Sequence, residues 1–173
     1  MKSHTGQNAA QALSVIGTKQ KGPYYWVGHG DNGIEYFIGQ TFKSSKSGYL
    51  KNIQVFMEMI VGQTGACLSL YEFDKPAYCF AAEKGSCYVP LSQQMENQWV
   101  SFEMHNLYLD AQKQYAFKIN CNSAGMLAIA ECTWQAGNPY PDGEEWIGSS
   151  VDPNGVFHPH LGLAFLAEIE TDY

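Results

Sequence analysis

Apolar and polar residues alternate along this chain in short segments that end in turn residues. In residues 99–105, for example, Val100, Phe102 and Met104 alternate with Ser101, Glu103 and His105. Successive side chains of a β-strand point to opposite faces, so this pattern predicts a half-buried strand. Segments of similar strand character are residues 34–42, 49–61, 66–73, 78–82, 86–91, 115–121, 126–132 and 161–169.

Short strands separated by frequent turns favour an all-β fold over a parallel α/β fold. We predict an antiparallel two-sheet β-sandwich of jelly-roll-like topology. The chain of 173 residues is long enough for one ordinary domain. We place that domain at residues 21–173, with residues 1–20 as an N-terminal extension that packs on it or leads into it. Only residues 8–16 have a helical period, and residues 28–33 and 136–159 are expected to be loops.

The charge pattern excludes some ligands. All ten basic residues are lysines at or before Lys118, and the formal net charge is −7. A chain without arginine and with a negative charge is a poor nucleic-acid binder, and it lacks the forked donor that clamps phosphates. The apolar run 9–16 is broken by Gln11 and Ser14, so it predicts neither membrane insertion nor a signal peptide. The sequence leaves the compartment open.

The five cysteines include no C-x-x-C pair, which argues against a zinc ribbon or a thioredoxin-like site. We interpret them as small buried apolar residues. The alternative is that Cys79 and Cys87 face each other across a hairpin that turns at residues 83–85. Residues 28–33 match G-x-G-x-x-G letter for letter, but a strand follows them instead of a helix, which favours a glycine-rich loop over a dinucleotide site.

The sequence predicts neither a metal site nor a cofactor. His158 and His160 are two residues apart, but Pro159 between them favours a surface turn and nothing supplies a third ligand. Calcium is a weaker alternative because the acids do not follow the spacing of the EF-hand loop. Its candidate ligands are Asp142, Glu144, Glu145 and Asp152.

Catalysis finds less support than binding. The chain has no G-x-S-x-G motif. A glycoside hydrolase or lyase would need two carboxylates that converge in one groove. Outward-facing strand glutamates are more often solvated surface, so we expect no enzyme. The glutamates that lie in or beside strands are Glu58, Glu72, Glu103 and Glu131.

Aromatic residues gather in or beside the two expected loops. Trp134, Tyr140 and Trp146 lie in or beside the longer loop together with Asp142 and Glu144, while Trp26 precedes the shorter one, after Tyr24 and Tyr25. Aromatic rings pack on the C–H faces of sugars, and carboxylates accept hydrogen bonds from sugar hydroxyls. The alternative is that the rings cap the ends of the sandwich core.

The order of segments resembles a bacterial jelly-roll module that is appended to carbohydrate-active enzymes and surface proteins and grouped with carbohydrate-binding or galactose-binding-like domains. The matching segments are residues 39–42, 48–55, 65–71, 99–102, 107–117, 138–143 and 163–165. The resemblance implies a non-catalytic module and suggests an extracellular or cell-surface location. The chain departs from it at Gly162, where such modules often carry an acid, and in its five cysteines.

We therefore predict a binding module for a neutral carbohydrate. Trp134, Tyr140, Trp146 and Trp26 would supply stacking, and Asp142 and Glu144 would accept hydroxyl protons. The alternative is a structural or protein-interaction domain of a surface or virion-like assembly. The sequence does not set the oligomeric state.

Overall fold

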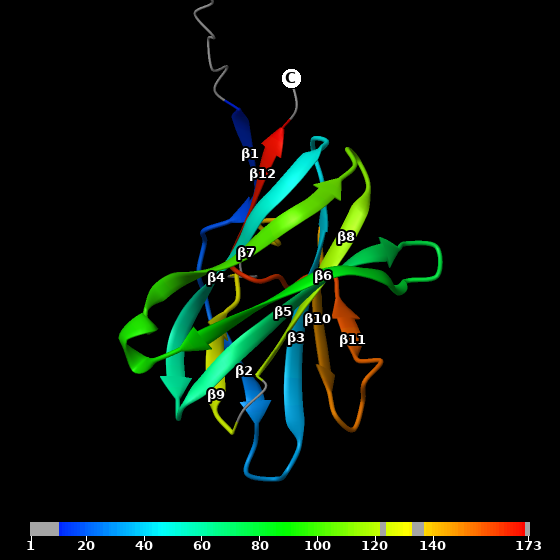
Figure 1. Ribbon diagram of the computed structural model, residues 1–173. Helices are drawn as coiled ribbons and strands as arrows, with labels where there is room; N and C mark the ends of the chain where they lie inside the picture. Colours follow the sequence, from blue (N-terminus) through cyan, green and yellow to red (C-terminus); the bar gives the residue numbers. More distant parts are fainter. Residues whose placement is uncertain (1–10, 122–123, 133–136, 172–173) are drawn as a thin grey trace, which may run out of the picture.

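The structure is a computed structural model that describes residues 11–121, 124–132 and 137–171 (Figure 1). Within these residues it contains strands and one short 3-10 helix, η1 (Gln93–Met95). The strands are β1 (Ala12–Thr18), β2 (Tyr24–His29), β3 (Glu35–Lys43), β4 (Gly48–Val61), β5 (Thr64–Asp74), β6 (Cys79–Leu91), β7 (Gln98–Leu109), β8 (Gln114–Cys121), β9 (Met126–Ala130), β10 (Glu145–Ser149), β11 (Val156–His158) and β12 (Phe165–Thr171).

The fold is all-β and antiparallel, which confirms the predicted fold class. The strands follow the order β1-β12-β4-β9-β2-β3-β8-β5-β6, while β7 pairs with β4, β10 pairs with β3, and β11 pairs with β10. The sheet curls strongly (Figure 1), a shape compatible with a β-sandwich. The described part of the chain has no helix that is long and apolar enough to span a bilayer.

The core lies on the inner face of the curled sheet, and Phe165 of β12 is at its centre. The Phe165 ring lies 6.2 Å from the Phe42 ring of β3 and 5.6 Å from the Phe117 ring of β8. These strands are not neighbours of β12 in the sheet, so the contacts cross the core. Val100, Phe102 and Met104 are buried, as predicted. The alternate apolar residues of β4 and of the segment that contains β12 are buried too, namely Ile53, Val55, Met57, Leu163, Ala167 and Ile169.

Three short strands arise where the sequence predicts loops or a helix. Residues 12–16, part of the candidate helix, lie in β1, which pairs along its whole length with β12. That helix prediction is wrong because strand pairing outweighs a weak helical period. The strands β10 and β11, of five and three residues, lie in the expected loop 136–159. The Gly, Pro and Asp residues around them are typical of loops, so the sequence does not indicate these strands.

The expected hairpin at residues 83–85 is also wrong. β6 runs unbroken from Cys79 to Leu91 against β5, so Cys79 and Cys87 lie on one strand and cannot face each other. The turn lies instead between Asp74 and Cys79. All five cysteines are free thiols. Cys121 and Cys132 are buried, as expected for apolar residues, but Cys79 is exposed.

A second apolar cluster covers part of the outer face. Trp146 of β10 packs edge to face on Phe80 of β6, at 5.2 Å, and Phe80 stacks on Phe157 of β11, at 5.7 Å. Gly39 of β3 lies directly opposite Trp146, and a Cβ there would come within 3.3 Å of its indole.

Removing the central core ring should strongly destabilise the fold. Phe165→Ala leaves a cavity among rings that come from distant strands, so we expect the free energy of unfolding to fall by about 3–5 kcal/mol. Urea denaturation followed by circular dichroism measures this change. Val151→Ala, at a side chain that is 71% exposed, is the control and should change it by less than about 0.5 kcal/mol. Equal effects of the two substitutions would contradict this description of the core.

Candidate functional site: an aromatic cleft beside a buried carboxyl pair

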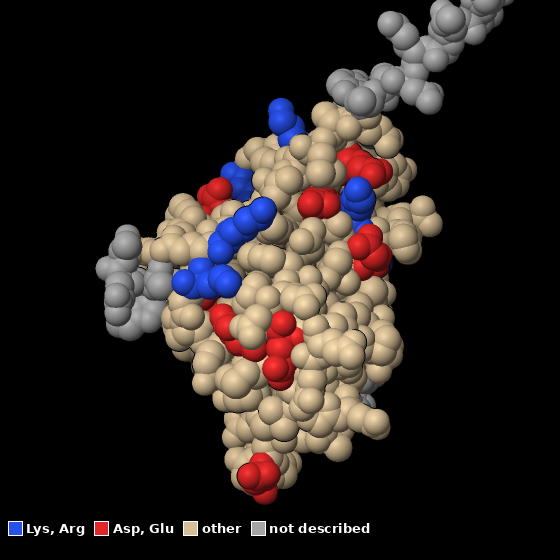
Figure 2. All heavy atoms as spheres, turned by 90° about the vertical axis from the view of Figure 1, so that its left-hand side faces the viewer, with Lys and Arg blue, Asp and Glu red and all other residues tan. Residues whose placement is uncertain are grey.

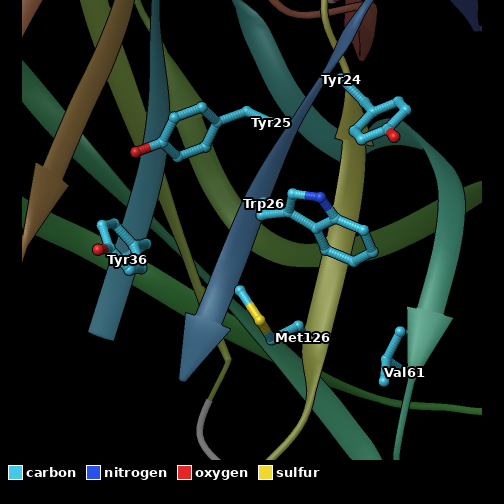
Figure 3. A pocket seen from close by; sticks show the side chains of 6 residues that line it. All are labelled: Tyr24, Tyr25, Trp26, Tyr36, Val61 and Met126. Atoms are coloured by element: carbon cyan, nitrogen blue, oxygen red, sulfur yellow. The ribbon is translucent and has the colours of Figure 1, made fainter. Parts of the chain in front are cut away.

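A cleft of about 400 Å³ is lined by six residues from four strands. β2 contributes Tyr24, Tyr25 and Trp26, and the remaining walls are Tyr36 of β3, Val61 of β4 and Met126 of β9. Tyr24 and Trp26 extend to one side of β2, and Tyr25 extends to the other side, toward Tyr36 (Figure 3). This arrangement follows from strand geometry, since consecutive side chains of a strand point to opposite faces.

The walls of the cleft are apolar, with polar groups at the ring tips. Trp26 is half-buried, and its ring meets that of Tyr24 edge to face at 5.7 Å. Asn32 Nδ2 donates a hydrogen bond of 2.8 Å to the Tyr36 hydroxyl, which holds that ring in place. None of the six lining residues carries a formal charge. The cleft therefore offers flat apolar surface and hydroxyl groups without an ionic partner.

Charged side chains are sparse on the face shown in Figure 2. Lysines and acids interleave in its upper half, and a group of acids lies near the centre (Figure 2). Between this group and the acid at the lower tip, the surface is uncharged (Figure 2). A continuous basic strip of the kind that tracks a nucleic-acid backbone is not visible among the coloured residues of this face.

The structure places the predicted site residues in different surroundings. Trp26 lies in the cleft. Trp146 is only 1% exposed, and its Nε1 donates to the Asn154 carbonyl at 2.9 Å, so its ring packs in the outer-face cluster instead of facing solvent. Tyr140 is half-buried against Phe165, and its hydroxyl accepts a hydrogen bond from the Lys43 amide. Trp134 lies outside the described residues.

Asp142 and Glu144 line a separate polar hollow of about 170 Å³. Lys43 and Lys75 line it too, and the Tyr78 hydroxyl donates to the Glu144 carboxylate. These acids therefore lie among lysines and do not share a wall with Trp26 or Trp146. Within residues 11–121, 124–132 and 137–171, no three His, Cys, Asp or Glu side chains are grouped as metal ligands.

A pair of carboxyl groups influences Tyr25, one of the residues that line the cleft. Glu145, at the start of β10, is completely buried, and it stands opposite Gln40 of β3 and His158 of β11. Its carboxyl lies beside that of Glu131, which follows β9. Neither oxygen of Glu145 has a hydrogen-bond donor among the described residues. Two ionised carboxylates cannot hydrogen-bond to each other, but a proton held between them would give one oxygen of each carboxyl a partner.

Burial and the neighbouring Glu131 raise the pKa of Glu145 to about 9. Burial also raises the pKa of Glu131, while hydrogen bonding to Glu145 and the nearby His158 act in the opposite direction. The negative charge of Glu131 and Glu145 also raises the pKa of two neighbouring groups. Burial and both glutamates raise the pKa of the Cys132 thiol to about 12. Burial, Tyr36 and both glutamates raise the pKa of Tyr25, which links the pair to the cleft.

Comparison with known proteins adds no assignment, since no protein-family model and no curated protein matches the chain.

The sequence predicts only part of these features. Trp26 stands out beside Tyr24 and Tyr25, but no local pattern indicates that Tyr36, Val61 and Met126 complete a cleft, because they come from three other strands. The sequence also gives no sign that Glu131 and Glu145 are neighbours. Glu145 is placed by β10, and the sequence does not predict that strand because the residues around it are typical of loops.

The carboxyl pair should make the stability of the domain depend on pH. The pKa of Glu145 is higher in the folded state than in the unfolded chain, so between about pH 4.5 and 9 the folded state holds an extra proton. Stability then falls as pH rises through this window, by up to about 1.4 kcal/mol per pH unit. Glu145→Gln keeps the shape and removes this titration, so its unfolding free energy should fall less steeply.

Urea denaturation from pH 5 to pH 9 measures both slopes. Glu168→Gln is the control, because it makes the same change at a half-buried glutamate that, unlike Glu145, accepts a hydrogen bond, from Asn52 Nδ2. If wild type and Glu145→Gln show the same dependence on pH, the pair does not hold a proton in this window.

Proposed function

We propose that this domain is a non-catalytic module that binds a neutral carbohydrate in the aromatic cleft of β2, β3, β4 and β9. The observation that carries the proposal is the half-buried indole of Trp26 in a cleft whose lining includes three tyrosines and no charged residue. The sequence-based expectation of a glycan ligand is kept, but the binding surface moves from the loop 136–159 to β2.

The chemistry of the walls favours sugars over fully apolar ligands. A flat ring offers area to the C–H face of a pyranose at low entropic cost, and the tyrosine hydroxyls both donate and accept hydrogen bonds. The Tyr36 hydroxyl already accepts from Asn32, so its own proton is directed away from that amide. Pockets that combine apolar walls with a few placed polar groups are typical ligand sites.

The lack of charge in the cleft favours a neutral glycan. No lysine lines it, and the protein as a whole carries a net charge of −7. An acidic polysaccharide would find no counter-charge at this site and would be repelled at longer range. The polar hollow with Asp142 and Glu144 is a weaker candidate because its acids already have lysines and Tyr78 as neighbours.

The carboxyl pair does not favour a glycoside hydrolase or lyase. Glu131 and Glu145 are neighbours that influence each other's pKa, whereas such an enzyme needs two carboxyls that both reach the scissile bond of a bound sugar. Glu145 is also completely buried, and neither glutamate lines the aromatic cleft.

Replacing the central indole should weaken glycan binding. We expect Trp26→Ala to weaken binding at least about tenfold, since it removes a ring that would bury area against the sugar. A screen of neutral polysaccharides on a glycan array, followed by calorimetric titration, measures the effect. Tyr108→Ala is the matched control, because Tyr108 is an exposed ring on β7 that pairs with Tyr49 away from the cleft.

Two outcomes would contradict the proposal. One is the absence of binding to any neutral polysaccharide. The other is binding that Trp26→Ala leaves unchanged.

A protein-interaction role is the second candidate. The observation that favours it is β1, which ends the sheet and exposes Leu13 and Val15, at 47% and 54%. Exposed edge strands are templates for pairing with another chain. If this role is correct, light scattering after size-exclusion chromatography will show an oligomer, and Val15→Lys will reduce it to a monomer. A monomer at every concentration would count against it.

A further inference from the structure

Lys118 of β8 is the last basic residue of the chain, and its ammonium group lies over three rings. Its Nζ is 4.0 Å from the centre of the Phe80 ring, 4.5 Å from that of Trp146 and 5.4 Å from that of Tyr71. Cation–π contacts of this kind hold a cation in a fixed position. They do not satisfy its N–H donors as an oxygen acceptor would.

Lys118 has no ionic partner among the described residues. Lys84 and Lys113 both pair with Glu72, whereas no carboxylate of the described chain forms an ion pair with Lys118. Burial lowers the pKa of Lys118, and no neighbouring acid opposes this effect. Lysines are seldom buried without a partner, and this chain has acids in excess, with a net charge of −7.

The sheet places polar and flat groups around this cation. Ser69 of β5 is directly opposite Lys118 on one side, and Gly39 of β3 is opposite it on the other. Because Gly39 has no side chain, the Trp146 indole approaches across the strand. Lys118 lines a hollow of about 250 Å³ together with Ser69, Asn120, Tyr71, Phe37 and Trp146. No acid lines this hollow.

We propose that this hollow, distinct from the aromatic cleft, binds a small carboxylate carried on a flat ring. The ammonium of Lys118 donates to the carboxylate, and the Ser69 hydroxyl and the Asn120 amide lie in the same hollow as further donors. The rings of Tyr71 and Phe37 provide apolar walls for the ligand ring. Charge-assisted hydrogen bonds are about twice as strong as neutral ones, so the negative charge is essential to recognition.

Benzoate and benzamide test the site, because they have the same shape but differ in charge. In calorimetric titrations of the full chain, we expect benzoate to bind at least about tenfold more tightly than benzamide. We expect Lys118→Met, which keeps the chain length and loses the charge, to remove this preference. Lys51→Met, at an exposed lysine of β4, is the matched control and should leave it unchanged.

A second readout does not depend on the variant folding. In ¹H–¹⁵N spectra of the wild-type chain, benzoate should shift the amide signals of Lys118 and Asn120 and the indole signal of Trp146, and benzamide should not. Equal binding of the two probes, absence of benzoate binding, or benzoate affinity that is unchanged in folded Lys118→Met would each overturn the proposal.

Discussion

The pairing of β10 with β3 is the constraint on which the buried acid pair and the hollow around Lys118 depend. Because side chains alternate along a strand, this register sends Trp146 to the outer face and Glu145 to the inner face. The indole then closes over Gly39 and contacts Phe80 and Lys118. The carboxyl lies beside that of Glu131, and both groups raise the pKa of Tyr25. One five-residue strand thus builds the cationic hollow and the buried acid pair.

The acid pair and Lys118 are both ionisable groups that are at least partly buried. Burying a charge is unfavourable, and the acid pair lessens this penalty by keeping a proton, since two adjacent buried carboxylates do not readily both ionise. Lys118 lessens the penalty by lying over aromatic rings, which attract a cation through their electron-rich faces. The two groups lie on opposite faces of the sheet, as the alternation of their strands requires, and so they do not neutralise each other. The aromatic cleft has no charged lining residue and is chemically separate from both.

The sequence predicts the all-β fold and most of the inner core because alternation is a local signal. Residues such as Phe102, Ile53 and Leu163 are buried as their spacing indicates. The sequence does not predict β10 and β11. They contain five and three residues, too few to show a clear alternation of apolar and polar side chains among the surrounding Gly, Pro and Asp residues. The sequence also fails for Trp146, because no local pattern shows that a second cluster covers the outer face.

The candidate site was only partly predictable for the same reason. Trp26 could be selected as an aromatic residue before a loop, but the cleft forms only when β2 joins β3 and β9 in the sheet. Lys118 gave no signal beyond being the last basic residue, because its three aromatic neighbours come from β5, β6 and β10.

We propose the uncharged aromatic cleft as the ligand-binding surface of the domain. Titration of the wild-type chain with a neutral oligosaccharide, followed by amide and indole shifts in ¹H–¹⁵N spectra, maps the surface that binds. We expect the shifts to concentrate at Tyr24, Tyr25, Trp26, Tyr36 and Met126. Shifts centred on Asp142 and Glu144, or no shifts with any neutral oligosaccharide, would contradict it.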